Sequence, residues 1–120
     1  MLFRSLKDSV GVPVLANGDT YNLEDVNKIV TLTGVDGVMA ARGILENPAL
    51  FIGEAVTPAA CVRELLEHSV RCPIPFPLVL HHMSEMTARL PGMTKKERKR
   101  LMACRDLVDL IDFTEDKWRD

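Results

Sequence analysis

The sequence predicts an α/β fold with parallel strands, followed by a small all-α domain. Two short apolar runs, Val12–Ala16 and Val35–Ala40, alternate with helical patterns in the order typical of βα units. From Thr57 onward only helical periodicity remains. Because two strands are too few for a parallel sheet that is covered on both faces, we expect the chain to hold the end of a larger α/β structure.

The elements of the first half follow from local signals. Residues 2–10 carry apolar side chains at helical spacing and predict the first helix. Asn22 is placed to cap the second helix, and Gly34 is placed to end it. The pair Asn47-Pro48 predicts the start of a third helix, since a cap is followed by proline at the first position. The inner face of the second helix is expected to hold Val26, Ile29 and Val30.

The second half predicts three amphipathic helices in antiparallel order. The first is expected to be capped by Thr57 and to end at the stiff connector "CPIPFP", residues 72–77. A second apolar stripe runs from Leu78 to Leu90. The segment "TKKE", residues 94–97, is a capping box that opens a third helix continuing through Ile111. We place the domain boundary near Glu54–Thr57, which gives domains 1–55 and 56–120.

Composition restricts the function without naming it. The chain is 47% hydrophobic and 27% charged, with a net charge of −2, so no global basic field indicates nucleic acid. The three cysteines have no metal-type spacing and predict reduced thiols; a zinc site shared with His68, His81 or His82 is the less favoured alternative. No apolar run reaches the roughly 20 residues of a membrane-spanning helix, and we predict a cytoplasmic or organellar-matrix setting.

Each predicted strand ends in a turn poor in side chains. Asn17-Gly18-Asp19 follows the first strand, and Ala41-Arg42-Gly43 follows the second. The carboxyl ends of parallel strands meet at one edge, where glycines admit a close approach to the backbone and an arginine can pair with phosphate oxygens. The turns therefore predict a shared phosphate site. The alternative is that they are ordinary turns that only redirect the chain.

Residues 6–52 resemble the end of the catalytic barrel of the tRNA-dihydrouridine synthases. The family pattern is a strand ending in Ala-Asn-Gly-Asp, a helix, then Thr-Gly-x-Asp-Gly-Val-Met, a small residue, Arg-Gly and Asn-Pro, and every part of it is present here. Ala41 stands where many bacterial members have glycine, which favours the eukaryotic branch. The helical tail resembles the family's C-terminal domain less specifically.

The resemblance implies a fold and an activity. Residues 1–55 would be the last two βα units of a TIM (β/α)8 barrel that binds FMN, incomplete in this chain. Residues 56–120 would be a small all-α domain that binds tRNA. The enzyme would reduce uridine to dihydrouridine in the tRNA D-loop, with NADPH as the reductant. The implied contacts with the FMN phosphate are Asn17, Gly18, Asp19, Ala41, Arg42 and Gly43.

The resemblance assigns no catalytic residue and no metal to this chain. The family's catalytic cysteine lies on an earlier barrel loop, and none of Cys61, Cys72 and Cys104 matches it. We therefore expect these 120 residues to be inactive alone, and the incomplete barrel to self-associate.

A run of basic residues on the predicted third helix of the tail could follow a tRNA backbone. The alternative is a solvated helix face without a ligand. Two other functions remain open: a non-catalytic module that binds tRNA or a protein, and a different phosphate-binding barrel related to the dihydroorotate dehydrogenases. The predicted nucleic-acid contacts are Lys95, Lys96, Arg98, Lys99, Arg100 and Arg105.

Overall fold

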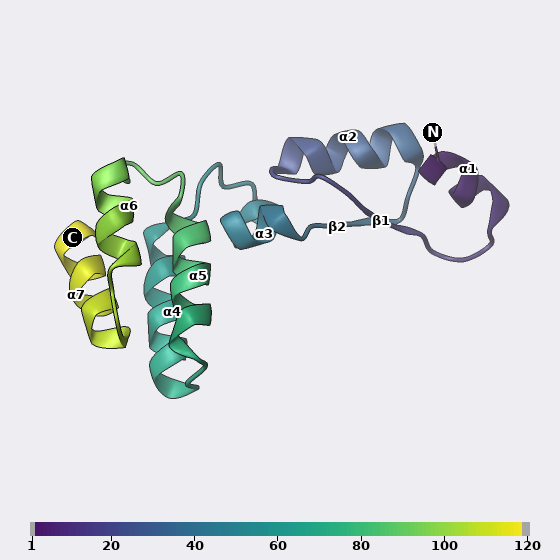
Figure 1. Ribbon diagram of the computed structural model, residues 1–120. Coiled ribbons are helices and arrows are strands. Elements are labelled where there is room, and N and C mark those ends of the chain that lie inside the picture. Colours follow the sequence, from purple (N-terminus) through teal and green to yellow (C-terminus); the bar gives the residue numbers. More distant parts are fainter. Residues whose placement is uncertain (1, 119–120) are drawn as a thin grey trace. The chain divides into compact units, whose positions relative to one another are not determined.

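The computed structural model describes residues 2–118 and divides into two compact units, residues 1–55 and residues 56–120. The described chain is mixed α/β and mostly helical, with a parallel sheet of two strands (Figure 1). The predicted α/β class is confirmed, because helices and a parallel sheet are both present. That the two strands belong to a TIM barrel stays a prediction. Within the same residues, no helix is both long and apolar enough to cross a bilayer.

The first unit is built around one βαβ crossover. Strand β1 pairs in parallel with β2, and Ala16 lies opposite Val38. The side chains of Val14, Ala16 and Val35 form a small buried cluster, against which Phe3 and Ile29 pack. Its elements are α1 (Leu2–Ser9), β1 (Leu15–Asn17), α2 (Leu23–Thr33), β2 (Gly37–Met39), α3 (Arg42–Glu46) and the 3-10 helix η1 (Leu50–Ile52).

Strand β1 differs from its prediction in position and in burial. It begins at Leu15 rather than Val12, and only its central residue, Ala16, is buried. Val12 and Leu15 are 62% and 58% exposed, so the expectation that both faces of the strand are covered is wrong for this structure. A two-stranded sheet lacks the neighbours that would bury the second face.

Helix α2 has the predicted caps. The Asn22 side chain accepts a hydrogen bond from the Asp25 amide at 2.8 Å. Gly34 adopts a left-handed conformation with φ of 69°, and its amide donates to the Val30 carbonyl at 2.8 Å. The predicted inner face is only partly buried, because Val30 remains 39% exposed.

A helix does follow Asn47-Pro48 as predicted, but it is only the short 3-10 helix η1, which begins at Leu50. The sequence did not predict helix α3, which begins at Arg42 and ends just before Asn47. The Asn47 side chain accepts from the Ala49 amide at 3.0 Å and donates to the Glu54 carbonyl at 2.7 Å. This asparagine therefore fixes the turn into η1 instead of opening a long helix, which is the second common use of an Asx side chain.

The second unit contains four helices in its described residues, not the predicted three. They are α4 (Ala59–Arg71), α5 (Phe76–Thr87), α6 (Lys95–Met102) and α7 (Leu107–Trp118). The expected third helix is broken between Met102 and Leu107. Asp106 explains the break, because its side chain accepts from the Asp109 amide at 2.9 Å and so caps a new helix.

Two predicted helix starts are realised in part. Thr94 accepts from the Glu97 amide at 3.3 Å, but the Glu97 carboxylate pairs with Arg100 at 3.0 Å, so one half of the capping box forms. Helix α4 begins at Ala59, directly after Thr57-Pro58 as predicted, and Pro58 at its N-cap position makes no side-chain cap hydrogen bond; the role of Thr57 as the cap stays a prediction.

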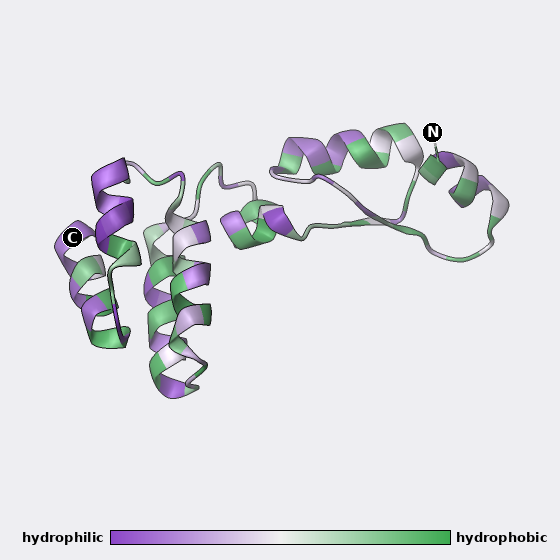
Figure 2. Cartoon of the chain, viewed as in Figure 1, coloured by the Kyte–Doolittle hydropathy of each residue, from purple (hydrophilic) through white to green (hydrophobic). Residues whose placement is uncertain are grey.

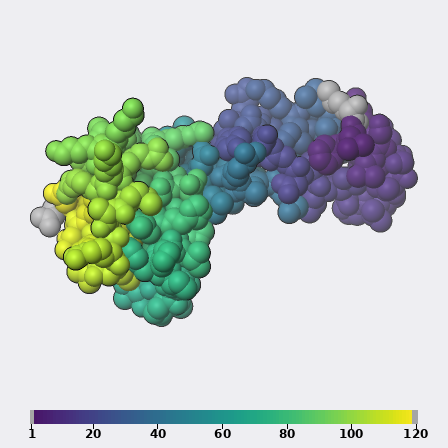
Figure 3. Space-filling view, viewed as in Figure 1, coloured from purple at the N-terminus to yellow at the C-terminus, as the bar shows by residue number. Residues whose placement is uncertain are grey.

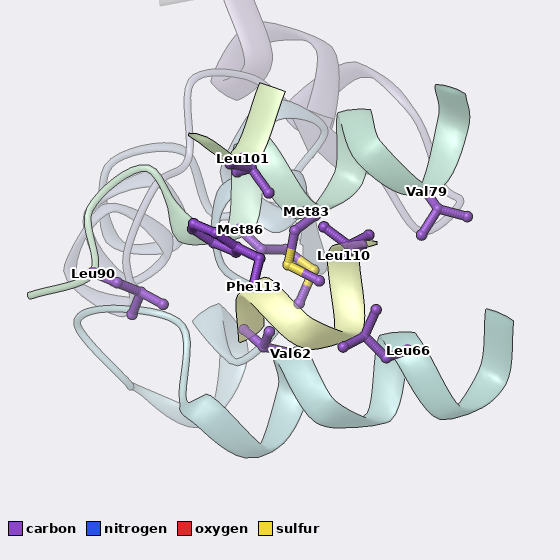
Figure 4. Packing of buried hydrophobic residues seen from close by; sticks show 9 residues of the cluster. All are labelled: Val62, Leu66, Val79, Met83, Met86, Leu90, Leu101, Leu110 and Phe113. Carbon is purple, nitrogen blue, oxygen red and sulfur yellow. The ribbon is translucent and has the colours of Figure 1, made fainter. Parts of the chain in front are cut away.

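The four helices enclose one hydrophobic core (Figure 4). Met83 and Leu110 are completely buried at its centre, where α5 faces α7. Trp118 packs edge-on against Phe113, with 6.0 Å between the ring centroids. The buried members are Val62, Leu66, Val79, Met83, Met86, Leu90, Leu101, Leu110 and Phe113.

Candidate functional site

The ends of the two strands line a common cavity of about 270 Å³ in the first unit. Because β1 and β2 are parallel, their carboxyl ends lie at the same edge of the sheet. All six residues predicted for a phosphate site line this cavity, together with two that the sequence analysis did not select. The lining residues are Asn17, Gly18, Asp19, Thr20, Tyr21, Ala41, Arg42 and Gly43.

Gly43 joins the two turns by a close backbone contact. A Cβ atom on residue 43 would lie 1.8 Å from the Thr20 carbonyl oxygen and 3.0 Å from a Leu50 methyl group. The space that a side chain at position 43 would fill is therefore occupied by the backbone of Thr20. The sequence had predicted that a ligand would approach the backbone there. The absence of a side chain at Gly43 lets Thr20 lie directly against the start of α3.

Gly18 has the opposite environment. Nothing lies within 4 Å of the place where its Cβ would be. The space beside Gly18 is therefore open to a ligand approaching the backbone, as the phosphate prediction requires.

Arg42 is the cation of the cavity. Its guanidinium pairs with the Asp19 carboxylate and lies 6.0 Å from the centre of the Tyr21 ring. Both partners of the ion pair are exposed, with 70% of the Arg42 side chain and 74% of the Asp19 side chain accessible. Exposed pairs contribute little to stability, so Arg42 can exchange Asp19 for another anion at low cost.

The first turn of α3 adds amide donors at the same place. Leu45 donates to the Ala41 carbonyl at 3.2 Å, which is the first hydrogen bond of this helix. The amides of Arg42 and Gly43 precede it and have no acceptor within the helix. With only five residues, α3 has a short dipole, so these individual donors matter more than the helix as a whole.

Thr20 is a cavity residue that sequence reasoning missed. It is 1% exposed, and its hydroxyl oxygen has no hydrogen-bond partner in the structure. The only sequence signal was its position between the Asn17-Gly18-Asp19 turn and the Asn22 cap. That signal gives no measure of burial.

The predicted basic surface divides into two kinds of residue. Helix α6 is strongly hydrophilic (Figure 2) and lies at the surface of the second unit (Figure 3). Arg100 pairs with Asp116 at 2.8 Å and with Glu97 at 3.0 Å, and Arg105 pairs with Asp109 at 3.2 Å. Hydrogen bonding to Asp116 raises the pKa of Arg100, and bonding to Asp109 raises that of Arg105.

The remaining four predicted cations have no such partners. Within residues 2–118, no ion pair engages them, and all are exposed. The structure therefore gives a set of available positive charges along α6, which we call the basic face: Lys95, Lys96, Arg98 and Lys99.

The dihydrouridine synthase (Dus) family model matches residues 3–119. The chain belongs to the dihydrouridine synthase family. It is 32% identical over 118 residues to the mouse tRNA-dihydrouridine(20a/20b) synthase [NAD(P)+]-like protein, covering 98% of this chain and 36% of the relative. The Saccharomyces cerevisiae tRNA-dihydrouridine(20a/20b) synthase [NAD(P)+] is 38% identical over 103 residues, which cover 85% of this chain and 28% of the relative.

The human tRNA-dihydrouridine(20a/20b) synthase [NAD(P)+]-like protein is 32% identical over 114 residues, or 94% of this chain and 35% of the relative. The chain thus spans about a third of the length of these curated relatives. These matches confirm the predicted family and the predicted likeness to its eukaryotic members.

The cysteines of this dihydrouridine synthase chain are free thiols in the second unit. Cys72 is exposed, whereas Cys61 and Cys104 are half-buried. Burial raises the pKa of the Cys104 thiol, so this side chain favours its neutral form. Across the described residues, no three His, Cys, Asp or Glu side chains are grouped as metal ligands.

Proposed function

We propose that this chain supplies the FMN-phosphate side of a tRNA-dihydrouridine synthase, which reduces uridine to dihydrouridine in the tRNA D-loop with NADPH. Bound FMN would supply the hydride chemistry, and the chain's own residues would hold its phosphate. The observation that carries the proposal is the cavity shared by the two strand ends. Family membership and the NAD(P)+ in the relatives' names support the same function.

The residues of the cavity fit a phosphate group. Gly18 leaves open space for it, Arg42 offers a bidentate donor, and the first amides of α3 add further donors. Asp19 is the one unfavourable charge, and Arg42 neutralises it in the structure. We assign no catalytic residue to this chain.

Comparing FMN with riboflavin tests the proposal, since the two ligands differ only in the phosphate. We expect FMN to bind more tightly, and Arg42→Ala combined with Gly18→Val to remove most of that preference. Lys28→Ala is the matched control, because Lys28 is also an exposed cation paired with an acid in the first unit. Equal binding of FMN and riboflavin to the unmodified chain would reject the phosphate site.

A second candidate function is tRNA binding by residues 56–120 without catalysis. The helices of this unit have a core of their own, and the basic face presents cations free to contact phosphates. The two functions are compatible, since a modifying enzyme must also hold its RNA. Flavin binding tests the first unit, and tRNA titration against salt tests the second.

A further inference from the structure

The Asp19 carboxylate is held differently from four other aspartates of the described chain. Each of those four carboxylates accepts a hydrogen bond from a backbone amide, at 2.6 to 3.1 Å: Asp25, Asp36, Asp106 and Asp109. Within residues 2–118, the Asp19 carboxylate pairs with the Arg42 guanidinium and accepts from no backbone amide. Its position is therefore not fixed by the turn on which it lies.

The Arg42 guanidinium is held equally loosely. It contacts the Asp19 carboxylate and lies over the Tyr21 ring, 6.0 Å from the ring centre. Because 70% of the Arg42 side chain and 74% of the Asp19 side chain are accessible, water competes for both charges. No other hydrogen bond of the described residues holds either side chain, so the pair can open without breaking a second one.

This ion pair lies where an entering anion would bind. Asp19 and Arg42 both line the cavity at the strand ends, and the space beside Gly18 is open. A carboxylate and a phosphate use the same guanidinium N–H donors, so they compete for one binding partner. The two anions also repel each other at short range. For both reasons the Asp19 carboxylate opposes the binding of a phosphate.

An aspartate can instead help a ligand by positioning an arginine. That role needs a carboxylate whose own position is fixed by the fold. Asp36 has this character, because it accepts from the Val14 amide as well as from a lysine, whereas Asp19 lacks a backbone donor. The half-buried Tyr21 is the firmer neighbour of Arg42, and its ring can keep the guanidinium at the cavity after the carboxylate has moved away.

We propose that Asp19 is an internal competitor of the anion site: its carboxylate occupies Arg42 until a ligand phosphate displaces it. One ion pair is exchanged for another, and no covalent bond changes. The inference rests on the proposed function for the identity of the ligand as FMN. For inorganic phosphate it rests on the geometry of the cavity alone.

Asp19→Asn tests the competition, because it removes the charge and keeps the size of the side chain. In an NMR titration of the full chain at low ionic strength, we expect this variant to bind inorganic phosphate about fivefold more tightly than the unmodified chain. Glu24→Gln is the matched control, since Glu24 is an exposed acid that pairs with Lys28 and does not line the cavity. Unchanged or weaker phosphate binding by Asp19→Asn would overturn the inference.

The exchange has a readout of its own in the unmodified chain. Phosphate should shift the side-chain carboxyl ¹³C signal of Asp19 and the Nε signal of Arg42 along one common binding curve, because one contact is lost as the other forms. Matched additions of sodium chloride control for ionic strength. If the Arg42 signal moves while the Asp19 signal stays constant, the original pair survives in the complex. That result would overturn the inference even if Asp19→Asn binds phosphate more tightly.

Flavin binding separates this inference from the proposed function. Asp19→Asn should tighten FMN binding about as much as phosphate binding and leave riboflavin unchanged, because the competition concerns the phosphate alone. If the unmodified chain binds FMN and riboflavin equally while Asp19→Asn still tightens phosphate binding, the FMN function fails and the competition with free phosphate stands. If FMN is preferred but Asp19→Asn changes neither affinity, the FMN function stands and the competitor is rejected. Absence of any phosphate response in both chains would also reject it.

Discussion

Gly43 lies so close to Thr20 that any side chain at position 43 would overlap the Thr20 carbonyl oxygen, 1.8 Å from the nearest Cβ position. This contact connects the turn after β1 with the start of α3. It makes the cavity between the two strand ends depend on one glycine.

Gly43→Ala should therefore destabilise the first unit, by about 2 kcal/mol or more, since a backbone carbonyl cannot move aside as a flexible side chain can. Gly18→Ala is the matched control, because the space beside Gly18 is open and its substitution should change stability by less than about 1 kcal/mol. Hydrogen exchange at the Ala16 and Val38 amides measures both effects. Equal protection in the two variants would contradict the proposed contact.

The Asp36 carboxylate predicts a pH dependence of the first unit. It accepts hydrogen bonds from Lys7 at 2.7 Å and from the Val14 amide at 2.6 Å, and these lower its pKa from the usual 3.8. A carboxylate with a lowered pKa in the folded state stabilises that state fully above its unfolded pKa. The stabilisation is lost as the pH falls through the lower folded value.

We therefore expect Val14 amide protection to fall below about pH 4 in the unmodified chain. Asp36→Asn should reduce protection at neutral pH and flatten its change in the acid range. Asp8→Asn, which removes another acid near the end of α1, is the control and should keep the original profile. A profile that Asp36→Asn leaves intact would assign the acid sensitivity to other carboxylates.

The basic face predicts that the cations of the second unit differ in their contribution to RNA binding. Replacing Lys95, Lys96 and Lys99 with glutamine should weaken tRNA binding and reduce the salt slope by roughly one for each phosphate that is no longer neutralised. Arg105→Gln should have a smaller effect, because Asp109 already neutralises that side chain. Titration of labelled tRNA at several salt concentrations measures both. Binding without a salt slope would exclude contact with the RNA backbone.

The core of the second unit predicts a large stability effect from a single truncation. Met83→Ala removes a completely buried side chain and should cost about 2–5 kcal/mol. Val108→Ala, on a side chain that is 66% exposed, should cost less than about 0.5 kcal/mol. Urea denaturation followed by Trp118 fluorescence reports on both, since Trp118 packs against this core.

The exposed side of the sheet predicts self-association. Leu15 and Met39 remain 58% and 49% exposed, so apolar surface on β1 and β2 is available to a second copy. Leu15→Ser should lower the apparent mass in sedimentation at high concentration. Val108→Ser, which changes an equally exposed residue of the second unit, should not. A monomeric unmodified chain would contradict this prediction.

Local signals predict the elements whose ends are set by single residues. Asn22 and Gly34 specify the two ends of α2 through a side-chain cap and a left-handed turn, and both are present. The meeting of the two turns is also predictable, because it follows from the parallel order of the strands. The ends of α2 depend on residues close in the sequence, and the meeting of the two turns depends only on the parallel order of the strands.

The features that sequence reasoning missed depend on contacts that a linear pattern does not record. Leu101, Cys104 and Val108 keep near-helical spacing across the break between α6 and α7, so periodicity could not reveal the Asp106 cap. The role of Gly43 comes from Thr20, which is distant in the sequence.

Each hydrophobic cluster draws its residues from one unit only: the smaller from residues 3–38 and the larger from residues 61–118. Each unit therefore holds a set of buried apolar side chains of its own, and this packing is what its stability depends on.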